Sequence, residues 1–155
     1  MPKNKVKHSF EIHGLDEFAR TLKQLPAAIA EAALTEAAEA GGKPILDAAK
    51  ANAPQELGNL KRSLDMKLAV YPHSKTATAI IGPRSREAGY AHLVEFGSGP
   101  RETKDGASRG TMPPQPFLRP AIDQTREQSI KAVGRVLGKA IEREAERLAK
   151  SGGGK

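Results

Sequence analysis

The chain has 155 residues, the size of one ordinary domain, and its 25 Lys and Arg against 18 Asp and Glu give a net charge of +7 and a pI near 9.8. It has no cysteine, which excludes disulfides, Cys-ligated zinc, iron–sulfur clusters and a thiol nucleophile. No apolar run approaches the roughly 18 residues that span a membrane, and none follows the basic start at residues 1–7, so we expect neither a transmembrane helix nor a signal peptide.

The N-terminal third is predicted to hold one strand and two helices. Alternating apolar residues predict a strand over 6–13, and apolar residues at helical spacing predict a helix over 15–25. An Ala-rich tract over 27–53 predicts a long helix, because Ala loses no side-chain entropy in a helix. Gly-Gly-Lys-Pro at 41–44 should kink or break this helix, since Pro44 lacks an N–H donor.

The middle of the chain is predicted to form a connector, a hairpin and a short helix. Residues 55–61 are rich in turn formers, and alternating or β-branched residues over 63–71 and 75–82 predict two antiparallel strands. Residues 90–96 fit a helix face or a strand, and we favour a short helix that Gly97 stops.

After this short helix comes a long loop and then a C-terminal helix. Residues 97–115 show no periodicity, and so long a loop is usually functional or disordered. The last helix has a predicted buried stripe of Ile122, Ile130, Val133, Leu137, Ile141, Ala145 and Leu148. We therefore predict one α+β domain over 1–150, with a small, mostly antiparallel sheet packed against the Ala-rich helix and the C-terminal helix, a flexible loop at 97–115 and a disordered tail at 151–155.

Residues that could carry chemistry do not converge in the sequence. His92 and Glu95 would share a helix face, but two ligands are too few for a metal site. His73 and Ser74 are adjacent in a turn, whereas a nucleophile and its base usually come from distant segments. We therefore expect no enzyme activity, no cofactor and no metal.

The long loop carries the basic residues Arg101, Lys104 and Arg109. It is either a solvated surface loop or an arm that orders against a neighbouring subunit, a partner or a phosphate backbone, and the sequence leaves both open. The proline-rich segment 112–120 that follows is predicted to position the last helix and to bury Phe117, although a ligand for a proline-recognition domain is an alternative.

Three segments in a fixed order resemble the head–tail joining, or tail-completion, proteins of long-tailed bacteriophages. They are Ala49-Lys50-Ala51-Asn52-Ala53-Pro54 followed by Gly58-Asn59-Leu60-Lys61-Arg62-Ser63-Leu64, then Tyr90-Ala91-His92-Leu93-Val94-Glu95-Phe96-Gly97, then Met112-Pro113-Pro114-Gln115-Pro116-Phe117-Leu118-Arg119-Pro120-Ala121. The start Gly14-Leu15-Asp16-Glu17-Phe18 also fits, so the resemblance covers most of the chain.

The resemblance implies an α+β virion protein, made in the host cytoplasm, that forms a ring of commonly six copies at the head-proximal end of the tail. Its partners would be copies of itself, neighbouring neck and tail-tube proteins and, without sequence specificity, the passing DNA; the free protein would be monomeric or weakly associated. The recurring family positions are matched by Glu95, Phe96, Gly97, Pro116, Phe117 and Pro120. By this resemblance Phe96 and Phe117 are buried anchors, Gly97 is a backbone turn and the prolines are stiffeners.

A ring closes only if each copy presents two different complementary surfaces, which the long basic loop and the sheet edge would supply. The basic loop is then expected to face proteins or solvent, because a lumen lined with Lys and Arg would grip DNA. The alternative function is a basic nucleic-acid-binding module, motivated by the net charge of +7. A small hydrolase has no convergent residues in its favour.

Overall fold

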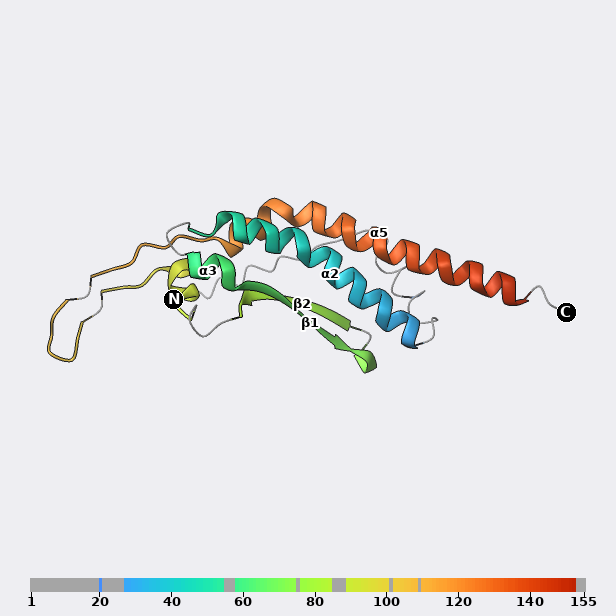
Figure 1. Ribbon diagram of the computed structural model, residues 1–155, viewed down its shortest axis with the longest axis horizontal. Coiled ribbons are helices and arrows are strands. Elements are labelled where there is room, and N and C mark those ends of the chain that lie inside the picture. The colour runs from blue at the N-terminus through green and yellow to red at the C-terminus, as the bar shows by residue number, and fades with distance from the viewer. Residues whose placement is uncertain are drawn as a thin grey trace, which may run out of the picture.

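The computed structural model describes residues 20, 27–54, 58–74, 76–84, 89–100, 102–108 and 110–152. The strand predicted over 6–13 lies outside these residues, as does all of the helix predicted over 15–25 except Arg20. The described part has the predicted α+β architecture, in which two long helices and a two-stranded sheet lie along one another and a thin arm projects from one end (Figure 1).

The sheet is an antiparallel hairpin, as predicted. Strand β1 (Leu64–Tyr71) pairs with β2 (Thr76–Pro83) through the short 3₁₀ turn η2 (Pro72–Ser74), in a register that places Met66 opposite Ile81 and Leu68 opposite Ala79. Because side chains alternate between the two faces of a strand, Met66, Leu68, Ala79 and Ile81 share one face.

Helix α2 (Ala27–Asn52) lies between the sheet and helix α5 (Leu118–Gly152) and contacts both. Two adjacent glycines mark the crossing point. A Cβ on Gly41 would lie 2.6 Å from Val133 of α5, and one on Gly42 would overlap Met66 and come within 3.0 Å of Ala79 in the sheet. The small residues therefore let α2 approach a layer on each side.

Of the kink or break predicted at Pro44, the break is wrong, because α2 is a single helix of 26 residues that contains Pro44. A proline inside a helix removes one backbone hydrogen bond and costs about 3 kcal/mol. Here the residues before it, Gly41 and Gly42, are buried, and the next turns continue to the buried Ala49. Packing on two sides therefore outweighs the local preference of proline, as tertiary contacts often do.

Two short helices complete the fold. Helix α4 (Ala91–Phe96) confirms the helix predicted before Gly97. Helix α3 (Gly58–Ser63) corrects the connector predicted over 55–61, and it forms because Leu60, fully buried, joins the core while its polar neighbours stay exposed. A single buried leucine gives no periodic pattern, which is why six residues of helix escape detection.

The hydrophobic core has two parts. The first, here called the junction core, brings together α2, α3, β1, α4 and the start of α5, and its members are Ala49, Ala53, Leu60, Leu64, Ala91, Val94, Phe117 and Ala121. The second, here called the helix-pair core, joins α2 to α5 through Ala33, Ala37 and Leu137. The two helices thus run antiparallel, with the end of α2 beside the start of α5.

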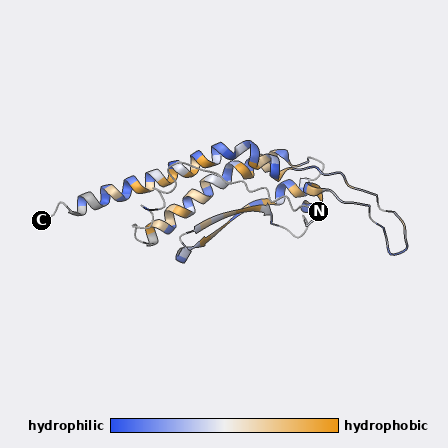
Figure 2. Ribbon diagram, turned by 180° about the vertical axis from the view of Figure 1, so that it is seen from behind, coloured by the Kyte–Doolittle hydropathy of each residue, from blue (hydrophilic) through white to orange (hydrophobic). Residues whose placement is uncertain are grey.

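Helix α5 extends for 35 residues and alternates hydrophobic and hydrophilic residues along its length (Figure 2). Its predicted buried stripe is only partly correct: Leu137 is buried, but Ile122 is 49% exposed and Ala145 is exposed. Near its end Glu144, not Ala145, is the buried residue, and its carboxylate accepts hydrogen bonds from Arg147 at 2.9 and 2.6 Å. The helix continues through Gly152, two residues into the predicted tail.

Candidate functional site

The residues matched to the family positions lie together at one end of the molecule, although they come from two separate segments. Glu95, Phe96 and Gly97 end helix α4, while Pro116, Phe117 and Pro120 surround the first turn of α5. The Glu95 side chain joins the segments: its Oε2 accepts hydrogen bonds from the backbone N–H groups of Phe117 (2.8 Å) and Leu118 (2.9 Å), and its Oε1 accepts one from Arg119 (3.0 Å).

This carboxylate acts as the N-terminal cap of α5 from a distant part of the sequence. The first N–H groups of a helix have no partner within the helix, and a negative charge near them also complements the helix dipole. Burial raises the pKa of the Glu95 carboxyl, but the backbone hydrogen bonds from Leu118, Phe117 and Arg119 outweigh it, so the pKa lies below its ordinary value. Glu95 is therefore ionised at neutral pH, although it is 93% buried, and its carboxylate accepts three backbone hydrogen bonds.

A second link fixes the same two segments. The backbone N–H of Gln115 donates to the carbonyl of Val94 at 2.7 Å. Phe117 itself is fully buried in the junction core, as predicted. The start of α5 is thus held against α4 by backbone bonds, by a charged cap and by an aromatic side chain.

Gly97 makes the predicted turn. Its φ of 73° lies in the left-handed region, and a Cβ at this position would come 2.7 Å from the carbonyl oxygen of Met112 and 2.9 Å from the nitrogen of Pro114. Both the backbone conformation and the lack of space therefore require glycine. The turn directs the chain out of the body into the projecting segment.

The projecting segment is a two-stranded arm. Ser98 and Met112 exchange backbone hydrogen bonds of 2.9 and 3.2 Å at its root, and Glu102 bridges Ser108 near its tip. From Gly99 to Thr111 every described residue is exposed except the half-buried Thr103. The arm, drawn in yellow and orange at the left of Figure 1, thus pairs with itself where the sequence showed no periodicity.

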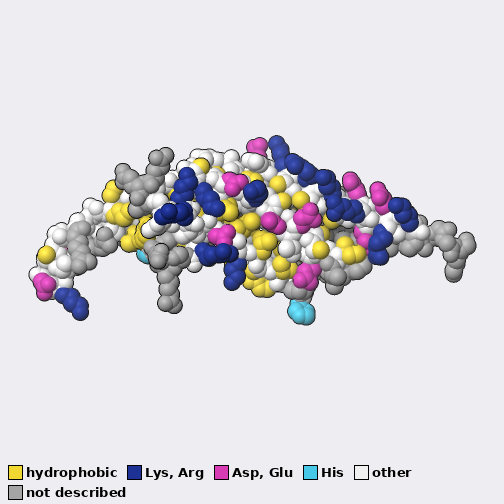
Figure 3. All heavy atoms as spheres, in the orientation of Figure 1, with side chains coloured by type: hydrophobic (Ala, Val, Ile, Leu, Met, Phe, Trp, Pro, Cys, Tyr) yellow, Lys and Arg dark blue, Asp and Glu magenta, His cyan; other side chains and the backbone are white. Residues whose placement is uncertain are grey.

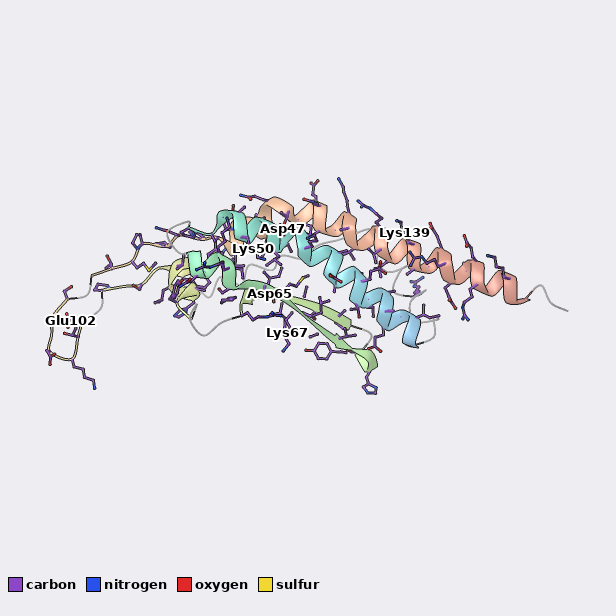
Figure 4. The ribbon with its side chains drawn as sticks, in the orientation of Figure 1. Asp47, Lys50, Asp65, Lys67, Glu102 and Lys139 are labelled. Atoms are coloured by element: carbon purple, nitrogen blue, oxygen red, sulfur yellow. The ribbon has the colours of Figure 1, made fainter. Side chains whose placement is uncertain are left out.

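Of the three basic loop residues, Lys104 lies at the exposed tip of the arm, while Arg101 and Arg109 lie outside the described residues. Figure 4 shows the neighbouring Glu102 at the far end of the arm, well away from the helices. The tip therefore carries both signs of charge.

Phe96 corrects the sequence prediction, because its side chain is 79% exposed and not a buried anchor. Consecutive residues of a helix point about 100° apart, so the inward position of Glu95 turns Phe96 outward. Since Gly97 follows at once, Phe96 stands on a short, well-anchored segment at the root of the arm.

An apolar surface surrounds this root. Pro113, Pro114 and Pro116 are exposed, and Pro114 packs within 3.0 Å of the Cβ position of Gly97, next to Phe96. In Figure 3 hydrophobic side chains gather where the arm meets the body. We call Phe96, Pro113, Pro114 and Pro116 the root patch.

A second exposed apolar surface lies on the hairpin. The face of the sheet opposite α2 carries Lys67, Ala69, Tyr71, Thr76, Thr78 and Ile80, of which Tyr71 and Ile80 are 53% and 52% exposed. Figure 1 shows this outer face turned away from both long helices. The described part thus presents two separate exposed apolar surfaces.

His92 does not act with Glu95. Its ring Nδ1 lies 2.8 Å from the carbonyl oxygen of Gly89 and its side chain is exposed, whereas Glu95 turns inward to α5. Among the described residues, no group of three His, Asp or Glu side chains has the geometry of a metal site, and no helix has the length and apolar character needed to cross a membrane.

Basic residues recur at a regular interval along α5. Lys131, Arg135, Lys139, Arg143 and Arg147 follow one another at intervals of four residues and therefore form a row along the helix. The interval itself is visible in the sequence, so counting basic residues at helical spacing would have found the row.

Comparison with protein families matches residues 16–97 to the family described as "Bacteriophage HK97-gp10, putative tail-component". The match covers more than half of the chain and spans α2, α3, β1, β2 and α4, ending at the glycine that opens the arm. Comparisons with curated proteins and with solved structures found no match. The chain belongs to this family of bacteriophage tail components, which implies a structural role in the tail of the virion among other virion proteins.

Proposed function

We propose that this tail component is a tail-completion protein, which assembles as a ring at the head-proximal end of the tail and helps to join the tail to the capsid. Membership of the tail-component family supports it, and so does the ordered resemblance of the segments at 49–64, 90–97 and 112–121 to tail-completion proteins. The observation that carries the proposal is the exposed arm with Phe96 at its root.

The arm has little to hold it in an isolated subunit. Its described residues are almost all exposed, so they bury no apolar area that would offset the entropy of ordering them. Contact with another copy would supply that area, with Phe96 as the central aromatic, because large aromatic side chains dominate the energetics of protein interfaces. The rigid attachment of the root through Glu95 and Gln115 reduces the entropy lost on binding.

The outer face of the sheet offers a complementary surface. A head-to-tail ring needs two different surfaces on each subunit, and the root patch and the sheet face are separate surfaces that both expose large apolar side chains, Phe96 on one and Tyr71 and Ile80 on the other. In this arrangement the arm of one copy lies across the sheet face of the next. This replaces the sheet edge expected from the sequence with the exposed sheet face.

The experiment is complementation of a phage whose copy of the gene is deleted. Wild-type protein should restore joined, infectious particles, Phe96→Ser should leave unjoined heads and tails, and Ile122→Ser should restore joining as a matched exposed apolar residue outside the two surfaces. Full joining without the protein would overturn the proposed function. Joining by Phe96→Ser would overturn the role of the root patch.

A further inference from the structure

The row of basic side chains on α5 is a surface that the arm and sheet leave unused. Lys131, Arg135, Lys139, Arg143 and Arg147 are all exposed. With a rise of about 1.5 Å per residue, successive members are about 6 Å apart and the row spans about 24 Å. Figure 3 shows Lys and Arg side chains following α5 along one border of the molecule, and Figure 4 labels Lys139 on this helix.

The positive charge of this row is only partly neutralised. Lys131 lies 4.0 Å from Glu127, a distant and highly exposed pair, and Arg147 is bonded to Glu144. Arg135, Lys139 and Arg143 make no ion pair within the described part of the chain. Four exposed acids lie on the same helix: Asp123 and Glu127 precede the row, and Glu142 and Glu146 lie beside its C-terminal part. The excess of positive charge is therefore greatest over the middle of α5, from Lys131 to Lys139.

The chemistry of the row differs from that of a protein interface. Interface cores are depleted in charged residues and contain aromatic or aliphatic side chains. The large exposed hydrophobic residues among the described ones are Tyr71, Ile80, Phe96 and Ile122, and none of them lies between residues 123 and 150. Single-stranded nucleic acid also fits poorly, because its binding sites use aromatic stacking platforms that α5 lacks.

We propose that the outer face of α5 binds the phosphate backbone of duplex DNA without sequence specificity, through Lys131, Arg135, Lys139 and their neighbours in the row. Residues four apart are offset by about 40° around a helix, so Lys131, Arg135 and Lys139 share one face, while Arg143 and Arg147 turn progressively away from it. Duplex DNA carries one negative charge per ~1.7 Å of its axis, so these three cations can meet several phosphates at once. Lys and Arg contacts to phosphate fix position but carry no sequence information. A single subunit carries the whole row, so the inference does not depend on ring assembly.

The test measures binding of the purified protein to a fluorescent 30-base-pair duplex of arbitrary sequence over a series of salt concentrations. Arg135→Gln combined with Lys139→Gln should weaken binding roughly tenfold at low salt and reduce the slope of log affinity against log salt by about 2, since each lost phosphate contact removes about 0.9. The matched control, Lys43→Gln with Lys61→Gln, removes the same charge at two exposed positions off the row and outside the arm, and should stay within about twofold of wild type.

Three results would overturn the inference. The first is no binding by the wild type at 50 mM salt. The second is an equal loss of binding in the Arg135→Gln/Lys139→Gln variant and in the control variant. The third is loss of self-association with unchanged DNA binding in the Arg135→Gln/Lys139→Gln variant, which would make the row a contact between copies. If the double variant unfolds, Lys139→Gln alone replaces it and should lower the slope by about 1.

Discussion

At one end of the α2–α5 pair, five elements enclose large side chains with no exposed area, whereas at the other end the two helices meet through alanines and one leucine. The junction core contains Phe117, Leu60, Leu64 and Val94, all fully buried, and the helix-pair core contains Ala33, Ala37 and Leu137. The difference indicates where the fold is rigid: the root patch is attached to the densely packed end, whereas the hairpin tip and the basic row extend along the lightly packed end.

The largest expected effect is a difference in stability between substitutions in the junction core and in the helix-pair core. Phe117→Ala should lower the free energy of unfolding by about 4 kcal/mol, because it empties a closed site, while Leu137→Ala should cost about 2 kcal/mol, because half-buried neighbours such as Val133 and Val136 can close the gap. Urea unfolding of both variants measures the comparison. Equal losses would show that the two cores contribute alike.

The next effect concerns the cap that joins α4 to α5. Glu95→Ala leaves the N–H groups of Phe117, Leu118 and Arg119 without their acceptor, and should lower the free energy of unfolding by about 2 kcal/mol. Glu95→Gln keeps one oxygen acceptor and should lose about half as much. Glu39→Gln, an exposed substitution on α2, should stay within about 0.5 kcal/mol of wild type in the same urea titration.

A third comparison uses two helical glycines and predicts opposite signs. Gly41→Ala places a Cβ 2.6 Å from Val133 and should destabilise the fold by about 1 kcal/mol, after allowing for the better helix propensity of Ala. Gly134→Ala on α5 meets nothing within 4 Å and should stabilise by about 0.5–1 kcal/mol. Thermal unfolding distinguishes them by the direction of the shift, and a gain from Gly41→Ala would contradict the close crossing of α2 and α5.

The smallest effect is a pH dependence of the cap. The pKa of Glu95 is lower in the folded than in the unfolded protein, so its contribution to stability is full above the unfolded value of about 4.3 and is lost as pH falls toward the folded value. The difference in unfolding free energy between wild type and Glu95→Gln should therefore be constant from about pH 6 to 8 and shrink below about pH 4.5. A difference that grows on acidification would reverse the assigned pKa direction.

The periodic elements of the fold follow from the sequence, because local pattern and tertiary environment agree in them. Residues 64–71 and 76–83 alternate, and the tract from Ala27 is rich in helix formers, so the hairpin and α2 were predictable. Gly97 was also predictable, since a glycine after an apolar helical segment commonly ends it. Among the expected site residues, Phe117 was predicted to be buried, and the structure confirms it.

The features that escaped prediction depend on contacts far apart in the sequence. Phe96 faces outward because its neighbour Glu95 is taken by α5, 22 or more residues away. Pro44 stays within α2 because the sheet and α5 hold the preceding glycines from opposite sides. The two strands of the arm pair through backbone hydrogen bonds between Ser98 and Met112. The sequence between these two residues has no periodic pattern of apolar residues that would have predicted this pairing. In each case a distant partner, and not the local pattern, decides the outcome.

The most direct test of the proposed assembly is an electron-microscopy reconstruction of the head–tail junction in the phage that encodes this protein. Ring assembly through the root patch predicts a ring of copies at the head-proximal end of the tail, with each arm lying across the outer sheet face of the next copy and Phe96 buried between them. Density for the protein elsewhere in the particle, or a ring in which Phe96 stays exposed to solvent, would contradict it.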